Sequence, residues 1–292
     1  MRVSIGIPFY NPGQYFQAAI SSVLQQTFQD FELILLDDGS TDDSLAIAQS
    51  FNDQRIKIIS DGKNRGLPAR LNELINLSSG EFIARMDADD LISRNRIALQ
   101  VEFLTANPQL NLVSTGICSI TNNNKVIGYR ESRQQHQQLT TSATIFGRAD
   151  IAHATIMARK TWYQRNNYNE NAKLMEDYQL WIDASIRNDL AVGYISTPLY
   201  FYREESSVSS QKAINAYRNQ FKIIYDNYFM HLNINEKIHF TMLSAIKITA
   251  VYVLNLLRNA SLLLKLRNKN TQQDSNKLRA LQNELDLIRL NS

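Results

Sequence analysis

The chain has 292 residues, 44% of them apolar, with 10 Gly and 5 Pro. This composition excludes a disordered chain and a minimal module, and it predicts one large domain or a domain with an appendage. The single cysteine, Cys118, excludes an internal disulfide and a cysteine-rich metal site, so we expect a reducing, cytoplasmic compartment. Pro8 and Asn11 interrupt the first apolar run before it reaches the length of a signal-peptide core, and no export signal is predicted.

The basic charge of the chain is concentrated at one end. Residues 1–211 hold 19 Lys and Arg against 23 Asp and Glu, whereas residues 212–292 hold 12 against 5. The net charge of +3 is too small to indicate a nucleic-acid partner, and none is expected. The basic excess therefore belongs to the C-terminal part alone.

The first hundred residues alternate short apolar runs with amphipathic stretches. This alternation is typical of parallel strands joined by crossover helices. The predicted fold class is α/β, with a doubly wound, mostly parallel sheet. In chain order the pattern predicts strand 3–8, helix 15–26, strand 31–36, helix 43–51, strand 55–60, helix 66–77, strand 81–86 and helix 94–106.

The alternation loosens after residue 106. Short strands such as 112–120 and 191–196, separated by polar loops, predict a mixed second half of the same domain. From residue 213 onward the pattern is helical, with a polar break before a last helix. The break is expected at 268–276 and the last helix at 277–290. The predicted organisation is one domain over 1–211, divided at about residue 105, and a helical extension over 212–292.

Polar side chains follow four of the predicted strands at their carboxyl ends. Ligands of doubly wound sheets bind in the crevice at this edge. The sequence therefore predicts a binding site there. The polar residues are Tyr10 and Asn11 after the first strand, Asp37 and Asp38 after the second, Asp61 after the third and Asp87, Asp89 and Asp90 after the fourth.

The Asp87-Ala88-Asp89 triplet is the strongest chemical signal at these strand ends. Two carboxylates spaced two residues apart leave the strand on one side and can bind one hard cation, Mg²⁺ or Mn²⁺. Mg²⁺ combines one or two carboxylates with phosphate oxygens of a substrate, so the pattern indicates a diphosphate ligand. The alternative is that Asp89 or Asp90 only caps the following helix.

Asp37 and Asp38 admit two interpretations. Both fit a turn in which Gly39 provides backbone freedom before the next helix. Asp38 is in addition placed to accept a hydrogen bond from a base N–H or a ribose hydroxyl. The ring of Tyr10 offers a surface on which a base can stack, so a nucleotide is a candidate ligand.

Four segments carry a known pattern: Val3–Asn11, Ser21–Thr27, Phe31–Asp42 and Met86–Asp90. Together they resemble the family 2 inverting glycosyltransferases with a GT-A fold, of the bacterial polysaccharide or lipopolysaccharide type. The resemblance is dense over the first half and continues as isolated motifs to about residue 210. It implies a GT-A fold with a nucleotide-binding half and an acceptor half, a nucleotide diphosphate sugar as donor, and Mn²⁺ or Mg²⁺ as cofactor.

The resemblance assigns residues of the first half to the donor. The segment from Pro8 to Tyr10 and the carboxylate of Asp38 look like the contacts with the base, and Arg70 looks like the basic residue that reaches the nucleotide. The implied nucleotide-binding residues are Pro8, Tyr10, Asp38, Arg70, Asp87 and Ala88. The implied metal ligands are Asp89 and Asp87, with Asp89 as the direct ligand.

In the second half, Met175–Trp181 resembles the Glu-Asp motif of the family, whose Asp is the catalytic base, which assigns Asp177. Inversion at an anomeric carbon needs a base on the face opposite the leaving diphosphate, and one carboxylate suffices. The alternative for Glu176 and Asp177 is an acid pair that complements a helix dipole. Further acceptor or phosphate contacts are implied for Glu176, His153, Trp181 and Arg203.

Two of these further contacts have specific alternatives. His153 can equally be an ordinary hydrogen-bonded histidine. The segment Phe201–Ser209 resembles the Tyr-Arg…Ser-x-Ser loop that the family places over the diphosphate, but a His often found after the Arg is absent and Glu205 stands near its place. Phosphate binding by this loop is therefore expected from Arg203.

The C-terminal extension can pack in three ways: on a membrane, on the catalytic domain or on a second copy of the chain. Lys247 and Arg258 interrupt the apolar stretch 240–266, so it is too short to cross a bilayer, but it can lie on an anionic leaflet as a peripheral membrane contact. It can also pack on the catalytic domain. The heptad-like spacing of Leu278, Leu281, Leu285 and Ile288 is compatible with a homo-oligomer.

These observations predict a metal-dependent inverting glycosyltransferase. It moves a sugar from a nucleotide diphosphate, expected to be UDP, to a hydroxyl of a growing glycan or a lipid-linked acceptor at the inner face of the cell membrane. One alternative is a phosphoryl or nucleotidyl transferase, since strand-end aspartates around Mg²⁺ also serve those reactions. Another is a catalytically inactive GT-A assembly module. The expected localisation is cytoplasmic.

Overall fold

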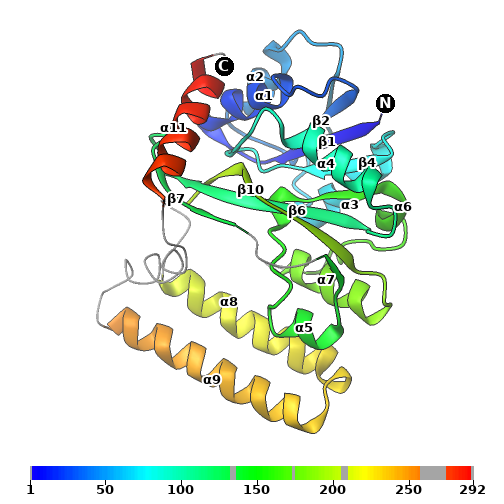
Figure 1. Cartoon of the computed structure of the whole chain (residues 1–292), viewed down its shortest axis with the longest axis vertical. Coiled ribbons are helices and arrows are strands. Elements are labelled where there is room, and N and C mark those ends of the chain that lie inside the picture. The colour runs from blue at the N-terminus through cyan, green and yellow to red at the C-terminus, as the bar shows by residue number, and fades with distance from the viewer. Residues whose placement is uncertain (1, 132–135, 173–174, 205–209, 257–273, 291–292) are drawn as a thin grey trace.

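The computed structural model describes residues 2–131, 136–172, 175–204, 210–256 and 274–290. One ten-stranded sheet, in the order β3-β2-β1-β4-β9-β6-β10-β5 with β7 on β6 and β8 on β10, forms its centre. Helices cover both faces of this sheet (Figure 1). The strands are β1 (Val3–Phe9), β2 (Phe31–Asp37), β3 (Ile56–Ser60), β4 (Phe82–Arg85), β5 (Leu91–Ile92), β6 (Leu112–Ile120), β7 (Val126–Arg130), β8 (Gln137–Gln138), β9 (Met157–Arg159) and β10 (Ala191–Arg203).

The first half is the predicted parallel sheet. β1 pairs in parallel with β2 and β4, and β2 with β3, so the carboxyl ends of these four strands meet at one edge. Every predicted element of this half is present, with ends shifted by at most two residues. The α-helices are α1 (Phe16–Leu24), α2 (Ser44–Ser50), α3 (Leu67–Leu77), α4 (Arg96–Ala106), α5 (Thr141–Ile145), α6 (Lys160–Tyr163), α7 (Glu176–Ile186), α8 (Ser210–Ile223), α9 (Ile234–Leu256) and α11 (Ser275–Leu290).

Two apolar layers fix the helices to the sheet. Ile20 of α1 and Leu104 of α4 are fully buried on one face, and Leu74 of α3 and Leu180 of α7 are buried on the other. Burying one such side chain stabilises the fold by about 1.5–3 kcal/mol. A Cβ at Gly6 would lie 2.1 Å from a methyl carbon of Leu74, so glycine in β1 allows α3 to pack closely on the sheet.

The second half is mixed, as predicted. β6 pairs in parallel with β10 but antiparallel with β7 and β9. The prediction for β10 was too short, because the strand continues past irregularities around Pro198 to Arg203. Phe201–Arg203 is therefore strand rather than loop, and residues 205–209 of the expected diphosphate loop lie outside the described residues.

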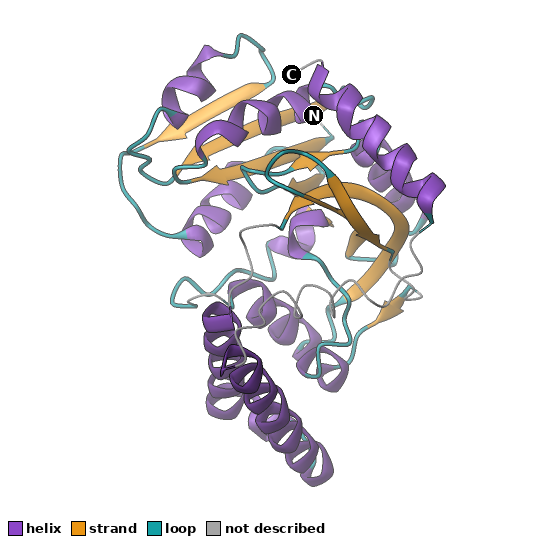
Figure 2. Ribbon diagram, turned by 90° about the vertical axis from the view of Figure 1, so that its left-hand side faces the viewer, coloured by secondary structure: helices purple, strands orange, loops and turns teal. Residues whose placement is uncertain are grey.

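The C-terminal helices occupy two separate places. α8 and α9 form a pair at one end of the molecule, here called the α8–α9 hairpin, which extends away from the sheet (Figure 2). α11 lies against the catalytic domain near the opposite end (Figure 1). Among the described helices, none has the length and hydropathy that a bilayer crossing requires.

α11 packs within the chain along its apolar stripe. Leu281, Leu285 and Ile288 are buried in one apolar cluster with residues of β5, β6, β7 and β10, Leu278 is partly buried there, and α11 lies against β7 and α1. The stripe expected to permit an oligomer is thus occupied by the protein's own core. α11 begins at Ser275, two residues before the predicted start, and most of the predicted polar break lies outside the described residues.

Candidate active site

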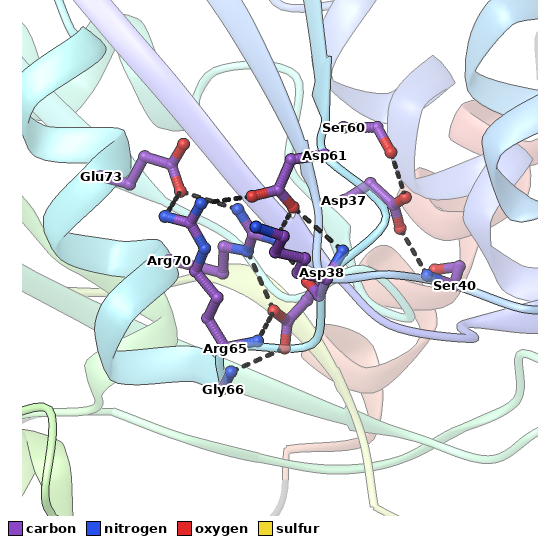
Figure 3. Close-up of polar contacts among 10 residues, drawn as sticks. Asp37, Asp38, Ser40, Ser60, Asp61, Arg65, Gly66, Arg70 and Glu73 are labelled. Atoms are coloured by element: carbon purple, nitrogen blue, oxygen red, sulfur yellow. Dashed lines mark hydrogen bonds and ion pairs between the residues drawn. The ribbon is translucent and has the colours of Figure 1, made fainter.

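Asp38 organises the loop that follows β3. Its Oδ1 accepts hydrogen bonds from the backbone N–H of Arg65 at 2.7 Å and from Nε of Arg70 at 2.9 Å, and its Oδ2 accepts from the N–H of Gly66 at 3.0 Å (Figure 3). Gly66 has a φ of 85°, which glycine adopts without strain, and α3 starts directly after it. Asp38 therefore fixes the start of α3 at the sheet edge.

Arg70 lies beneath this loop and is fully buried. Its guanidinium donates to Asp38, to Oδ1 of Asp61 at 2.6 Å, to Oε2 of Glu73 at 2.7 Å and to the carbonyl of Lys63 at 2.5 Å. Burial alone would lower the pKa of Arg70. The hydrogen bonds to Asp61, Asp38 and Glu73 outweigh this effect and raise the pKa above its ordinary value, so the group stays charged. The structure thus places Arg70 behind Asp38, bonded to protein atoms.

Of the other residues expected near the nucleotide base, Asp37 and Pro8 are buried parts of the fold and Tyr10 is exposed. Asp37 is buried, and its oxygens accept from the N–H of Ser40 at 2.8 Å and the hydroxyl of Ser60 at 2.7 Å, as the turn interpretation predicts (Figure 3). Pro8 is buried within β1. Tyr10, directly after that strand, is 53% exposed. Its ring is therefore open to a ligand.

The segment after β4 carries the acidic triplet. Asp87 pairs with the buried guanidinium of Arg85, and its backbone N–H donates to the hydroxyl of Tyr200 at 3.0 Å. Ala88 is partly buried against the core. Asp89 is more exposed than Asp87 and Ala88. Loss of solvation by the surrounding protein, followed by the negative charge of Asp87, raises the pKa of Asp89.

Arg203 is bonded to this segment from the end of β10. Its backbone N–H donates to Oδ1 of Asp90 at 2.7 Å and its Nε to the carbonyl of Asp89 at 2.9 Å. The rest of the guanidinium donates to the carbonyls of Thr121 and Asn122 and to Oδ1 of Asn124. The structure therefore places Arg203 among protein acceptors, where it supports the acidic segment.

A cavity of about 390 Å³ joins the acidic segment to the second half of the domain. Asp87 and Arg85 line it from the β4 side, and Glu176 and Asp177 line it from the start of α7. A second cavity of about 330 Å³ adjoins it and shares Asp177, with Tyr178 and Trp181 in its wall. Asp177 therefore lies between two spaces, the first of which also contains Asp87.

The environment of Asp177 favours a proton acceptor. Its Oδ1 accepts from the N–H of Tyr178 at 2.7 Å in the first turn of α7. Burial raises the pKa of Asp177, and the positive charge of Arg85 partly offsets this effect. Burial, followed by the charge of Asp177, also raises the pKa of Glu176. Both carboxyls titrate closer to neutrality than ordinary acids, as general bases often do.

His153 and Trp181 lie beside these acids. Nε2 of His153 is 2.7 Å from the hydroxyl of Tyr168, and its ring meets Trp181 edge-on with centroids 5.9 Å apart. Burial and then the charge of Arg85 lower the pKa of His153, which keeps the ring neutral. Trp181 is 4% exposed and stacks on Trp162, so most of its ring belongs to the core.

Sequence reasoning missed three charged residues in the first cavity. Arg85 carried a signal, because a cation two positions before Asp87 in a strand points to the same side of the sheet. Arg130 and Glu204 pair at 2.7 Å in the wall of the cavity, although they are 74 residues apart in the sequence. No local pattern predicts that pair.

The donor set at the acidic segment fits a divalent cation that a substrate helps to bind. Among the described residues, no group of three or more His, Cys, Asp or Glu side chains is arranged to hold a metal by itself. Asp89 and Asp87 supply hard oxygen ligands at one edge. Mg²⁺ and similar ions use one or two carboxylates together with phosphate oxygens and water.

Comparisons with known proteins show the family of the chain. The model of glycosyl transferase family 2 matches residues 4–166. An Escherichia coli relative, UDP-Glc:alpha-D-GlcNAc-diphosphoundecaprenol beta-1,3-glucosyltransferase WfgD, is 30% identical over 72% of this chain and 80% of its own.

Solved structures show the same fold. TarS of S. aureus, in complex with UDP-GlcNAc, has a TM-score of 0.59 at 19% identity, over 77% of this chain and 67% of that chain. The mannosyltransferase PcManGT of Pyrobaculum calidifontis, in complex with GDP-Man and Mn²⁺, has a TM-score of 0.58 at 13% identity, over 99% of this chain and 86% of that chain. The family match covers more than half of the sequence, and the chain belongs to glycosyl transferase family 2 and is a glycosyltransferase with the GT-A fold.

Proposed function

We propose that the chain is a metal-dependent, inverting glycosyltransferase that moves a sugar from UDP to a hydroxyl of a glycan or glycolipid. The observation that carries this proposal is the cavity that contains Asp87 on one side and Asp177 on the other. A donor whose diphosphate meets Asp87 presents its sugar toward Asp177. The names of the relatives support the substrate classes, because WfgD uses a UDP-sugar and a lipid diphosphate acceptor and TarS is seen with UDP-GlcNAc.

Asp38 favours uridine over cytidine. A carboxylate offers about four acceptor positions, and Arg65, Gly66 and Arg70 occupy three of them. The remaining position on Oδ2 suits a base that presents a ring N–H. Uracil presents such a donor and cytosine does not. The exposed ring of Tyr10 provides the stacking surface beside it.

Asp89, with Asp87, would hold Mn²⁺ or Mg²⁺ together with the donor diphosphate. When bound, the cation neutralises charge on the leaving nucleotide. Arg85 adds a fixed positive charge on the same side, and its buried Nε has no hydrogen-bond partner among the described residues. Arg85 also lines the first cavity, where its guanidinium can meet an oxygen of the donor.

Asp177 would act as the base. It takes the proton from the acceptor hydroxyl, whose oxygen then attacks the anomeric carbon from the face opposite the diphosphate, and the configuration at that carbon inverts. The second cavity, with Tyr178 and Trp181, is where we place the acceptor. His153, held neutral, lines the first cavity together with Asp177.

We also propose that residues 1–211 contain all groups that act on the substrates. Within them, about 1–105 bind the nucleotide and about 106–211 bind the acceptor. In the helical extension 212–292, α11 and the α8–α9 hairpin support this domain, since α11 packs on it and the hairpin packs on α5 and α7.

The test is a thermal-shift and calorimetric titration with UDP, GDP, CDP and dTDP, each with and without Mn²⁺. A ligand that binds only the folded protein raises its melting temperature. We expect stabilisation by UDP that depends on Mn²⁺, that is lost in Asp89→Asn and that is kept in the surface control Asp226→Asn. NMR of the product should show an inverted anomeric centre. Retention, or stabilisation by UDP that is independent of the metal, would contradict the proposal.

A further inference from the structure

The outer face of α9 is apolar and open to solvent. Ile234, Ile238, Met242 and Ile246 are 70%, 53%, 61% and 62% exposed. Between Ile234 and Tyr252, where the structure describes the side chains of this helix, no exposed residue is Asp, Glu, Lys or Arg. A surface helix of a soluble domain normally places its charges on this side.

The charged residues of the same stretch are turned toward the rest of the protein. Oε1 of Glu236 accepts from the hydroxyl of Ser142 at 2.6 Å. Nζ of Lys237 lies 5.3 Å from the ring centroid of Phe229, and Nζ of Lys247 lies 5.9 Å from that of Tyr217. The helix therefore buries Phe240 on its inner side, keeps its charged side chains along the rest of the protein and leaves the four apolar side chains named above on the solvent side.

We propose that the outer face of α9 binds the surface of an anionic phospholipid bilayer. The exposed apolar residues follow one another at intervals of four, so each is rotated by about 40° from the last and the stripe becomes a broad band. Pairing with a second copy in a coiled coil needs alternating intervals of three and four. A broad apolar band suits an interface into which side chains insert to shallow depth.

Charge favours an anionic surface over another copy of the chain. Residues 212–256, which make up most of the α8–α9 hairpin, hold five Lys and Arg against two Asp and Glu, and the sequence 257–273, directly after α9, contains four basic residues and no acidic one. Two copies that meet through this region would repel each other. Anionic lipid attracts it.

The position of the hairpin relates this face to the acceptor. Phe240 of α9 and Ile224 pack with Ile145 of α5 and Ile182 of α7. The hydroxyl of Tyr228 also donates to Oδ1 of Asp183 on α7 at 2.8 Å. The helix that carries Asp177 is thus joined to the helix that would rest on the bilayer. If the proposed function holds, on which this step rests, the acceptor is presented from the lipid surface.

The experiment is sedimentation of the full chain with vesicles of phosphatidylcholine alone or mixed equally with phosphatidylglycerol. We expect binding to the anionic vesicles that weakens about tenfold or more when Ile238→Ser, Met242→Ser and Ile246→Ser are combined. The matched control combines Leu77→Ser, Leu99→Ser and Ile127→Ser, which are 42%, 37% and 43% exposed on the catalytic domain. Melting curves verify that both variants fold.

Equal sedimentation of the wild type and the α9 variant would overturn the proposal. So would a wild-type dimer that fails to bind vesicles and that the α9 variant converts to a monomer. Because no donor or acceptor is present, the assay is independent of catalysis. A chain that binds vesicles but shows no metal-dependent response to UDP would contradict the proposed function and still support binding of the bilayer by α9.

Discussion

Nε of Arg203 donates to the backbone carbonyl of Asp89 at 2.9 Å, so the last residue of β10 is bonded directly to the acidic segment after β4. The same guanidinium donates to Oδ1 of Asn124, whose carbonyl accepts from Nε2 of Gln282 on α11 at 3.2 Å. A line of hydrogen bonds therefore runs from the C-terminal helix to the proposed metal ligands. Arg203 belongs to the support of the site, and the sequence-based expectation of a phosphate contact remains untested.

We expect Arg203→Lys to weaken the binding of UDP in the presence of Mn²⁺ by about tenfold, because lysine keeps the charge but loses the planar fork of donors. Calorimetric titration measures this change. Arg94→Lys, at an exposed arginine, is the matched control. An unchanged affinity in Arg203→Lys would show that Asp89 does not depend on this support.

Asp177→Asn should retain the metal-dependent binding of UDP and lose transfer by about a thousandfold or more, in line with general-base catalysis. In the wild type the base acts only when ionised. Because its pKa is raised by burial, kcat should fall with decreasing pH at values above those of an ordinary aspartate. Initial rates across pH test this. Substantial turnover by Asp177→Asn would remove it as the base.

Arg85→Lys tests the unpartnered Nε. Lysine preserves the charge opposite Asp87 but has no group at that position, so we expect KM for the donor to rise severalfold and kcat to fall about tenfold. Steady-state kinetics separates the two parameters. A variant with the kinetics of the wild type would show that the charge alone matters.

Arg70→Ala should destabilise the fold by about 3–5 kcal/mol, because it leaves the buried carboxylate of Asp38 and its neighbours without a counter-charge. Urea denaturation measures the loss. Lys222→Ala, which removes an exposed pair with Asp226, is the comparison and should cost about 1 kcal/mol or less. Similar losses in both variants would contradict a special role for the Asp38 cluster.

Glu32 provides a pH dependence of stability. Burial alone would raise its pKa, but Lys57 and the hydroxyls of Ser4 and Ser79 hold it at about 2. The depressed pKa of Glu32 stabilises the folded protein at pH values above 4.5, its ordinary pKa. This stabilisation is lost as the pH falls from there toward 2. The shift corresponds to about 3 kcal/mol. Glu32→Gln should reduce the free energy of unfolding at neutral pH and flatten its acid dependence. Parallel curves would refute this.

The sequence was sufficient for the parallel half and insufficient for the support of the site. The periodicity of apolar residues and the acids at the strand ends predicted β1 to β4 and the positions of Asp38 and Asp87, because these signals are local. The extent of β10 was missed since Pro198 suggests an end, whereas the strand passes it with an irregularity. The Arg130–Glu204 pair depends on distant segments that meet only in the fold.

The sequence predicted α11 as a helix, but it did not predict that α11 packs in one apolar cluster with β5, which directly follows the acidic segment. Its spacing of leucines fits a partner helix as well as a sheet, and only the tertiary structure distinguishes the two. The roles proposed for Asp177 and Asp89 likewise stay predictions until the variants are measured.

The packing of α11 on β7 and α1, over the apolar cluster that also includes β5, β6 and β10, has a consequence for biosynthesis. A ribosome releases residues 275–290 long after β4 and the acidic segment, yet these residues cover the core behind that segment. Domains of this size generally fold as units during synthesis, N-terminal parts first. Here the apolar cluster of Leu91, Cys118 and Phe201 is covered only after α11 has been synthesised, so a chain cut short before α11 would leave this cluster exposed.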